Sequence, residues 1–97
     1  MWILRSSGNH DGPLAFRLAP GAIKTVGRAP RADFIVDAAL VSRLHCRLTA
    51  AADALEVEDL SSTNGTYVND KRITRAQIVS GDRLRVGRIE LTVDKRA

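Results

Sequence analysis

Hydrophobic and polar residues alternate with a period of two along most of this chain. The clearest case is the segment 55–59, in which Leu55 and Val57 alternate with Glu56 and Glu58. This pattern is typical of β-strands that bury one face. Ten short segments have the character of strands: 2–5, 14–18, 22–26, 34–36, 45–49, 55–59, 66–68, 71–73, 83–86 and 89–93. Short strands at close spacing, with no convincing helical segment, predict a β-sandwich or a β-barrel.

Turn-forming residues separate these segments. Asn69-Asp70 and Gly87-Arg88 each join two segments directly, which predicts two-residue hairpins because Asn, Asp and Gly tolerate positive φ. Pro20-Gly21 and Gly81-Asp82 mark further turns, and the stretch 6–13 is a polar, glycine-bearing turn. The chain shows no internal repeat or linker, and its 97 residues predict a single domain spanning 1–97.

The composition limits the chemistry that this domain can perform. Apolar residues make up 44% of the chain and aromatic residues only 4%, so the core must be mostly aliphatic. The single cysteine, Cys46, excludes an internal disulfide. One cysteine and two histidines, Cys46, His10 and His45, form no metal-ligand cluster, so we expect no metal and no cofactor. Alternation turns Cys46 inward as a buried apolar residue, and we expect His10 to be solvated.

Several features bear on location. A lone cysteine fits a reducing compartment, so we expect the domain to be cytoplasmic. The chain has no run of about 20 apolar residues that would span a membrane. Its first residues become polar too soon for a secretory signal, and we therefore expect no membrane partner.

The net charge of +4, from 15 Lys and Arg against 11 Asp and Glu, favours an anionic partner. Nucleic acid is one alternative. However, the basic residues are scattered among acidic ones, and the aromatic residues do not form a stacking platform. The four aromatic residues are Trp2, Phe16, Phe34 and Tyr67. Nucleic-acid binding is therefore the less favoured interpretation.

Three loops, 27–33, 37–44 and 60–65, are unusually rich in Ser, Thr, Asn, Gly and Arg. Long polar loops at the end of a sandwich are where function is usually found. Their arginines can bind phosphate or carboxylate through a bidentate fork, and hydroxyl and backbone N–H groups in tight loops form anion-binding concavities. Together the three loops predict a shallow, cationic site, rich in hydrogen-bond donors, for an oxyanion.

An enzyme is a second alternative, because Ser42, His45 and Cys46 include a potential nucleophile and base. The chain has no Gly-x-Ser-x-Gly elbow, and Ser42 and His45 lie on neighbouring backbone without an evident orienting partner. We therefore expect no catalytic activity.

The order and spacing of the loop motifs resemble the forkhead-associated (FHA) domain from about Ile23 to Val93. The motifs are VGR, ADFIVDAALVSRLHCRL, VEDLSSTNGTYVNDKRI and GDRLRVG. The resemblance implies an antiparallel β-sandwich of about eleven strands, with binding loops at one end, that binds phosphothreonine in partner proteins. Such a module can be attached to a larger multidomain protein. An FHA fold that binds an unphosphorylated partner through its sheet face is a third alternative.

Carried over by position, the resemblance implies five ligand contacts. Arg28 corresponds to the principal phosphate ligand, Ser42 to the second phosphate contact, and Arg43 to a variable, often basic residue near the phosphate. Thr63 corresponds to a contact near the phosphothreonine, and Asn64 to the residue that holds the peptide backbone.

The resemblance also implies three structural supports of the site, Gly27, His45 and Gly65. His45 is expected to tie the binding loops together by hydrogen bonds without touching the ligand. Asp70 stands where the family often has glycine after the asparagine, a departure that suits the same turn.

Overall fold

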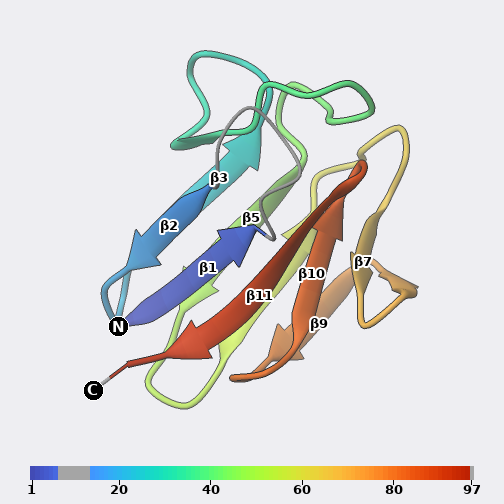
Figure 1. The fold of residues 1–97 in the computed structure, drawn as a ribbon. Helices are drawn as coiled ribbons and strands as arrows, with labels where there is room; N and C mark the ends of the chain where they lie inside the picture. Colours follow the sequence, from blue (N-terminus) through green and yellow to red (C-terminus); the bar gives the residue numbers. More distant parts are fainter. Residues whose placement is uncertain (7–13, 97) are drawn as a thin grey trace.

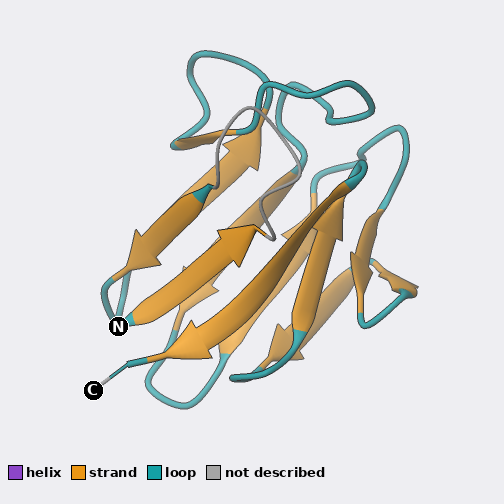
Figure 2. Cartoon of the chain, viewed as in Figure 1, coloured by secondary structure: helices purple, strands orange, loops and turns teal. Residues whose placement is uncertain are grey.

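The computed structural model describes residues 1–6 and 14–96. The predicted polar turn at 6–13, apart from Ser6, and its His10 lie outside the described residues. Within them no helix is present and eleven strands form two sheets (Figure 2). The strands are β1 (Trp2–Ser6), β2 (Ala15–Leu18), β3 (Ile23–Gly27), β4 (Phe34–Ile35), β5 (Cys46–Ala50), β6 (Leu55–Asp59), β7 (Thr66–Val68), β8 (Lys71–Ile73), β9 (Arg75–Ile78), β10 (Arg83–Val86) and β11 (Ile89–Lys95).

The sheets stack as a β-sandwich, which confirms the predicted fold class. The six-stranded sheet has the order β2-β1-β11-β10-β7-β8, and the five-stranded sheet has the order β4-β3-β5-β6-β9. All pairs but one are antiparallel. The exception is the pair β3 and β4, which run parallel, with Val26 opposite Phe34. The loop between them turns the chain back beside the end of β3, so that β4 runs in the same direction as β3.

The pattern of alternation missed one strand, β9. Only Thr74 separates it from β8, yet the two strands belong to different sheets, so the chain crosses the sandwich at this residue. Alanine is depleted in strands, which weakens the signal of RAQI. In the structure β9 pairs with β6 and places Ile78 opposite Leu55.

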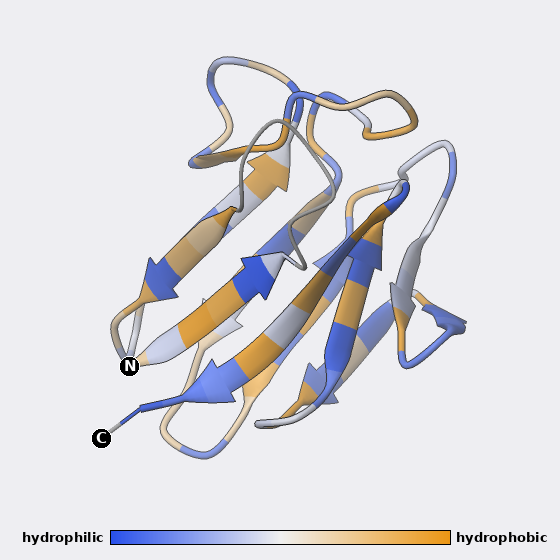
Figure 3. Ribbon diagram, in the orientation of Figure 1, coloured by the Kyte–Doolittle hydropathy of each residue, from blue (hydrophilic) through white to orange (hydrophobic). Residues whose placement is uncertain are grey.

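The core lies between the sheets, and its cluster of buried residues is aliphatic except for Trp2 and Cys46. The alternating hydrophobic bands of β10 and β11 are visible in Figure 3. Trp2 is 1% exposed and packs in the core, and its Nε1 donates to the Ala51 carbonyl at 2.9 Å. Burial, with a smaller contribution from the charge of Asp59, raises the pKa of the Cys46 thiol to about 12. Cys46 is thus a buried, unreactive thiol, as predicted.

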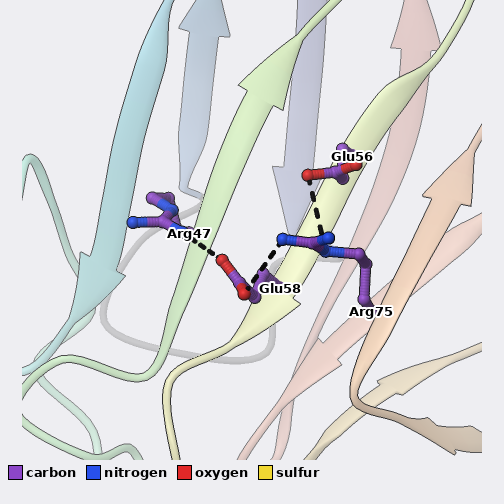
Figure 4. A network of polar contacts seen from close by, with 4 residues as sticks. All are labelled: Arg47, Glu56, Glu58 and Arg75. Carbon is purple, nitrogen blue, oxygen red and sulfur yellow. Dashed lines mark hydrogen bonds and ion pairs between the residues drawn. The ribbon is translucent and has the colours of Figure 1, made fainter.

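The outer face of the five-stranded sheet carries a neutralised charge network (Figure 4). Arg47 pairs with Glu58. Arg75 lies between Glu58, at 3.2 Å, and Glu56, at 3.7 Å. This face therefore presents balanced charges.

The hairpin between β7 and β8 has the two-residue turn that the sequence predicts. Asn69 and Asp70 have φ of 48° and 69°, the two positive values that a type I′ hairpin requires.

In Figure 1 the three loops after β3, β4 and β6 lie at one end of the sandwich, and both chain termini lie at the other. The Met1 amino group donates to the Arg96 carbonyl at 3.0 Å. Within the described residues no helix is long and apolar enough to cross a membrane.

Candidate functional site

Arg28 follows directly after β3 and is held by the neighbouring loop at both backbone and side chain. Its backbone N–H donates to the Ser42 carbonyl at 2.9 Å, and the next N–H, of Ala29, donates to the Arg43 carbonyl at 3.1 Å. The side-chain Nε donates to the Val41 carbonyl at 3.1 Å. A guanidinium has five N–H donors, so this contact orients the group and leaves the four donors of its two NH2 groups for a ligand.

Gly27 allows this close approach of the two loops. A Cβ atom at this position would lie 2.0 Å from the Arg43 carbonyl oxygen, which is backbone and cannot rotate away. Glycine is therefore required at position 27 because any side chain would clash with the neighbouring loop, and not because the backbone has a positive φ.

Ser42 connects the loop after β4 to the loop after β6. Its Oγ accepts a hydrogen bond from the Thr63 backbone N–H at 3.0 Å. Because a hydroxyl has one donor and two acceptor positions, the Ser42 O–H remains able to donate to a ligand. The Ser42 hydroxyl is thereby positioned as a donor at the mouth of the site.

His45 is fully buried and joins the same two loops from below. Its Nδ1 accepts from the Ser42 backbone N–H at 3.0 Å. Its Nε2 lies 2.8 Å from the Gly65 carbonyl oxygen. Since Nδ1 is an acceptor, the proton resides on Nε2 and is donated to Gly65. The imidazole therefore links loops 20 residues apart in sequence and does not reach the surface.

Asn64 and Thr63 are exposed at the tip of the loop after β6. The Asn64 Nδ2 donates to the Leu40 carbonyl at 3.1 Å, which leaves its Oδ1 free to accept a hydrogen bond from a ligand. Leu40 has a φ of 71°, which is uncommon for a branched side chain and marks a constrained loop.

Sequence reasoning missed the residues that build the loop after β6. The Asp59 Oδ1 accepts from the Thr66 hydroxyl at 2.7 Å and from the Ser62 hydroxyl. The Ser62 hydroxyl in turn accepts from the Gly65 N–H at 3.0 Å. The available signal was Asp59-x-x-Ser62, because an Asp side chain before a turn often accepts from a nearby downstream N–H. The Ser62 N–H does donate to Asp59, at 3.2 Å.

This network makes Asp59 sensitive to pH. Burial alone would raise the pKa of Asp59, but the hydrogen bonds from Ser62 and Thr66 outweigh it and hold that pKa below its ordinary value of 3.8. A carboxyl whose pKa is lowered by folding stabilises the folded state above its unfolded pKa. This stabilisation is lost as the pH falls below about 4 towards the lower, folded-state pKa.

Asp59→Asn should therefore lower the free energy of unfolding at neutral pH by about 1–3 kcal/mol. The variant should also lose less stability than the wild type between about pH 5 and about pH 2. Urea denaturation across this range measures both effects. Asp53→Asn is the matched control, because Asp53 is exposed and takes part in none of the side-chain hydrogen bonds or ion pairs found among the described residues, so its pH profile should follow that of the wild type. Parallel pH profiles for Asp59→Asn and the wild type would contradict this role.

The loops form two open hollows on the surface, each of about 550 Å³, that share Arg28. The first, which we name the serine hollow, is lined by Arg28, Asp37, Ala38, Ala39, Leu40, Val41, Ser42, Thr63 and Asn64. The second, the arginine hollow, is lined by Arg28, Ala29, Pro30, Arg31 and Arg43. Four of the five predicted ligand residues thus meet in one hollow, and Arg43 lies in the other.

The charges of this end are not neutralised within the described part of the chain. No ion pair found there involves Arg28, Arg31 or Arg43. No group of three or more His, Cys, Asp or Glu residues that could hold a metal ion occurs among the described residues. The arrangement suits an oxyanion bound by guanidinium and hydroxyl donors.

Comparison with known proteins places this geometry in a family. The model of the FHA domain matches residues 24–87. The chain is 38% identical over 80 residues to the ABC transporter ATP-binding/permease protein Rv1747 of Mycobacterium tuberculosis, covering 82% of this chain and 9% of that protein. It is 36% identical over 70 residues to the glycogen accumulation regulator GarA of the same species, covering 72% of this chain and 43% of that protein. The chain therefore spans less than half the length of either relative.

A solved structure supports the same assignment over nearly the whole chain. It is titled a structural and functional analysis of phosphothreonine-dependent FHA domain interactions. It superposes with a TM-score of 0.87 at 29% identity, covering 99% of this chain and 97% of that one. The family match over residues 24–87, the two-sheet sandwich and the loops gathered at one end all agree, and the chain belongs to the FHA domain family.

Proposed function

We propose that this FHA domain docks partner proteins that carry phosphothreonine, with Arg28 and Ser42 binding the phosphate. The observation that supports this most is the meeting of Arg28, Ser42, Thr63 and Asn64 in the serine hollow. The similar structure from the analysis of phosphothreonine-dependent FHA domain interactions supports the same ligand class.

The donors of the serine hollow match a phosphate group in number and charge. A phosphorylated side chain carries a charge of about −1.5 to −2 near neutral pH and has three acceptor oxygens. In our proposal the two NH2 groups of Arg28 bind two of these oxygens as a fork, and the Ser42 hydroxyl donates to the phosphate as well. Arg43, on the far side of Arg28, adds a second positive charge to the field.

The remaining site residues act on the peptide or on the loops. Asn64 accepts a backbone N–H of the peptide through its free Oδ1, and Thr63 lies beside the phosphothreonine. Gly27, His45 and Gly65 support the site from within the protein and do not contact the ligand. The support for this division is that His45 is buried, whereas Thr63 and Asn64 are exposed.

The function we propose is that of a non-catalytic interaction module. GarA, one of the relatives, is named a regulator. Because the chain spans only 9% of Rv1747 and 43% of GarA, we propose that residues 1–97 form one module that also occurs within larger proteins. We also propose that this module works in the cytoplasm. Nucleic-acid binding and phosphate-independent binding have less support, because the outer face of the five-stranded sheet is neutralised by its own ion pairs.

The site should prefer phosphothreonine to phosphoserine by at least about tenfold. Both ligands carry the same charge, so only the γ-methyl group, which we place between Thr63 and Asn64, distinguishes them. Burying one methyl contributes about 0.8 kcal/mol, or about fourfold in affinity. A pocket left empty by serine adds a cavity cost of the same order. Phosphoserine also has a freer χ1 than the β-branched residue, so it loses more rotamer freedom on binding.

Fluorescence polarisation with three peptides that differ only at this residue tests the proposal. Phosphothreonine should bind most tightly, phosphoserine at least about tenfold more weakly, and unphosphorylated threonine without measurable affinity. Equal affinity for the two phosphorylated peptides would make the domain a general phosphate binder. Equal affinity for all three would refute phosphate-dependent docking.

A further inference from the structure

The arginine hollow has no assigned ligand, although it is as large as the serine hollow. Its volume of about 550 Å³ lies within the usual range for ligand sites. Three of its five lining residues are arginines, Arg28, Arg31 and Arg43, and none is acidic. A hollow lined by one sign of charge concentrates ions of the opposite sign.

The two acidic residues that follow this loop in the sequence, Asp33 and Asp37, do not line the arginine hollow. The Asp33 carboxylate, two residues after Arg31, accepts hydrogen bonds from the Thr25 N–H at 2.8 Å and the Thr25 hydroxyl at 3.1 Å. Asp37 lines the serine hollow and not this one. On the outer face of the five-stranded sheet, by contrast, Arg75 lies between two glutamates (Figure 4). Among the described residues, no ion pair involves Arg28, Arg31 or Arg43, and of these three only Arg28 also borders the hollow that contains Asp37.

Arg28 connects the two hollows. Its Nε donates to the Val41 carbonyl. A fork to the phosphothreonine phosphate takes one N–H from each NH2 group, which leaves two N–H donors for a second anion. Two anions that share one guanidinium must lie close together. An extended peptide advances about 3.3 Å per residue. The second anion would therefore be carried within about three residues of the phosphothreonine.

We propose that the arginine hollow binds a second phosphate group, on a phosphorylated residue within about three positions of the phosphothreonine in the same partner chain. This inference rests on the proposed function. A phosphate suits the hollow better than a carboxylate, because it has three acceptor oxygens and nearly two negative charges for a three-arginine lining. The preferred partner is thus doubly phosphorylated.

A panel of peptides tests this inference by calorimetry. Each peptide carries one phosphothreonine, and a phosphoserine, glutamate or serine is placed in turn at each of the three positions before and after it. With the wild type, at least one doubly phosphorylated peptide should bind at least tenfold more tightly than its singly phosphorylated form. Glutamate at the same position should recover only a small part of that gain.

Arg31→Gln is the informative variant, because Arg31 lines only the arginine hollow. It should reduce the gain from the second phosphate to less than threefold while leaving binding of the singly phosphorylated peptide within about twofold. Arg17→Gln is the matched control. It removes the same charge from an exposed position on β2 and should keep the full gain, which separates a local site from general attraction to a basic protein.

Four results would overturn the inference. They are no gain with any doubly phosphorylated peptide, an undiminished gain in Arg31→Gln, an equal loss of gain in Arg17→Gln, and an equal gain from glutamate, which would indicate an unspecific anion site. Singly phosphorylated peptide that binds through Arg28 without any such gain would leave the proposed function standing. Singly phosphorylated peptide that does not bind at all would refute both.

Discussion

Replacing Arg28 with alanine is expected to weaken phosphothreonine binding by about 30-fold to several thousand-fold and to leave the fold intact. Removing one partner of a hydrogen-bonded charge pair costs about 2–5 kcal/mol, which corresponds to that range. Arg28 is exposed, and among the described residues its side chain makes one hydrogen bond, to the Val41 carbonyl. Its loss should therefore change thermal stability by less than about 1 kcal/mol, as is usual for surface substitutions.

Calorimetry with a singly phosphorylated peptide measures this effect, and two further variants sharpen it. Arg28→Lys keeps the charge but loses the planar fork and the Nε contact, so its affinity should lie between those of the alanine variant and the wild type. Arg17→Ala removes an equal charge from β2 and should bind normally. A change of less than threefold in Arg28→Ala would rule Arg28 out as the main phosphate ligand.

Replacing His45 with alanine is expected to lower thermal stability and binding together. The imidazole is fully buried, and its removal leaves the Ser42 N–H and the Gly65 carbonyl without their partner. A buried polar group left unpaired costs about 1–3 kcal/mol, and the cavity adds to that. Because Ser42 and the loop carrying Gly65 lose their common anchor, the serine hollow should lose its shape.

Thermal unfolding and calorimetry of the same samples separate a structural role from a ligand contact. His45→Gln is the graded variant, because its amide can replace one of the two hydrogen bonds, and it should fall between alanine and the wild type on both measures. A His45→Ala protein that melts like the wild type yet binds no peptide would instead make His45 a ligand contact.

Alternation along the chain predicted most of the fold because the sandwich buries one face of most strands, although three consecutive residues of β1 are buried. In β6, Leu55 and Val57 are fully buried and Glu58 lies in the outer ion-pair network. The hairpin at Asn69-Asp70 was predictable because its positive φ values are local preferences of those residue types. The strand β9 was not predictable, because its sheet is determined by pairing with β6 and not by its own residues.

The site was predictable in its residue types but not in its arrangement. Arg28, Ser42 and Asn64 stand out by motif, whereas the division of the arginines between two hollows depends on how the loops cross in space. The roles of Asp59 and Thr66 arise from contacts over seven residues around a turn. Such contacts have a weak local signal, because a Ser-, Thr- and Asp-rich loop can form many alternative hydrogen bonds.

We propose that the phosphate docks at the loop end of the sandwich. Two-dimensional NMR of the 15N-labelled domain can locate the binding surface, with a phosphothreonine peptide and the same peptide after phosphatase treatment. The phosphorylated peptide should shift the amide signals of Arg28, Ser42, Thr63 and Asn64, and the treated peptide should shift none of them. Identical shifts with both peptides, or shifts centred on the outer face of β5, β6 and β9, would contradict it.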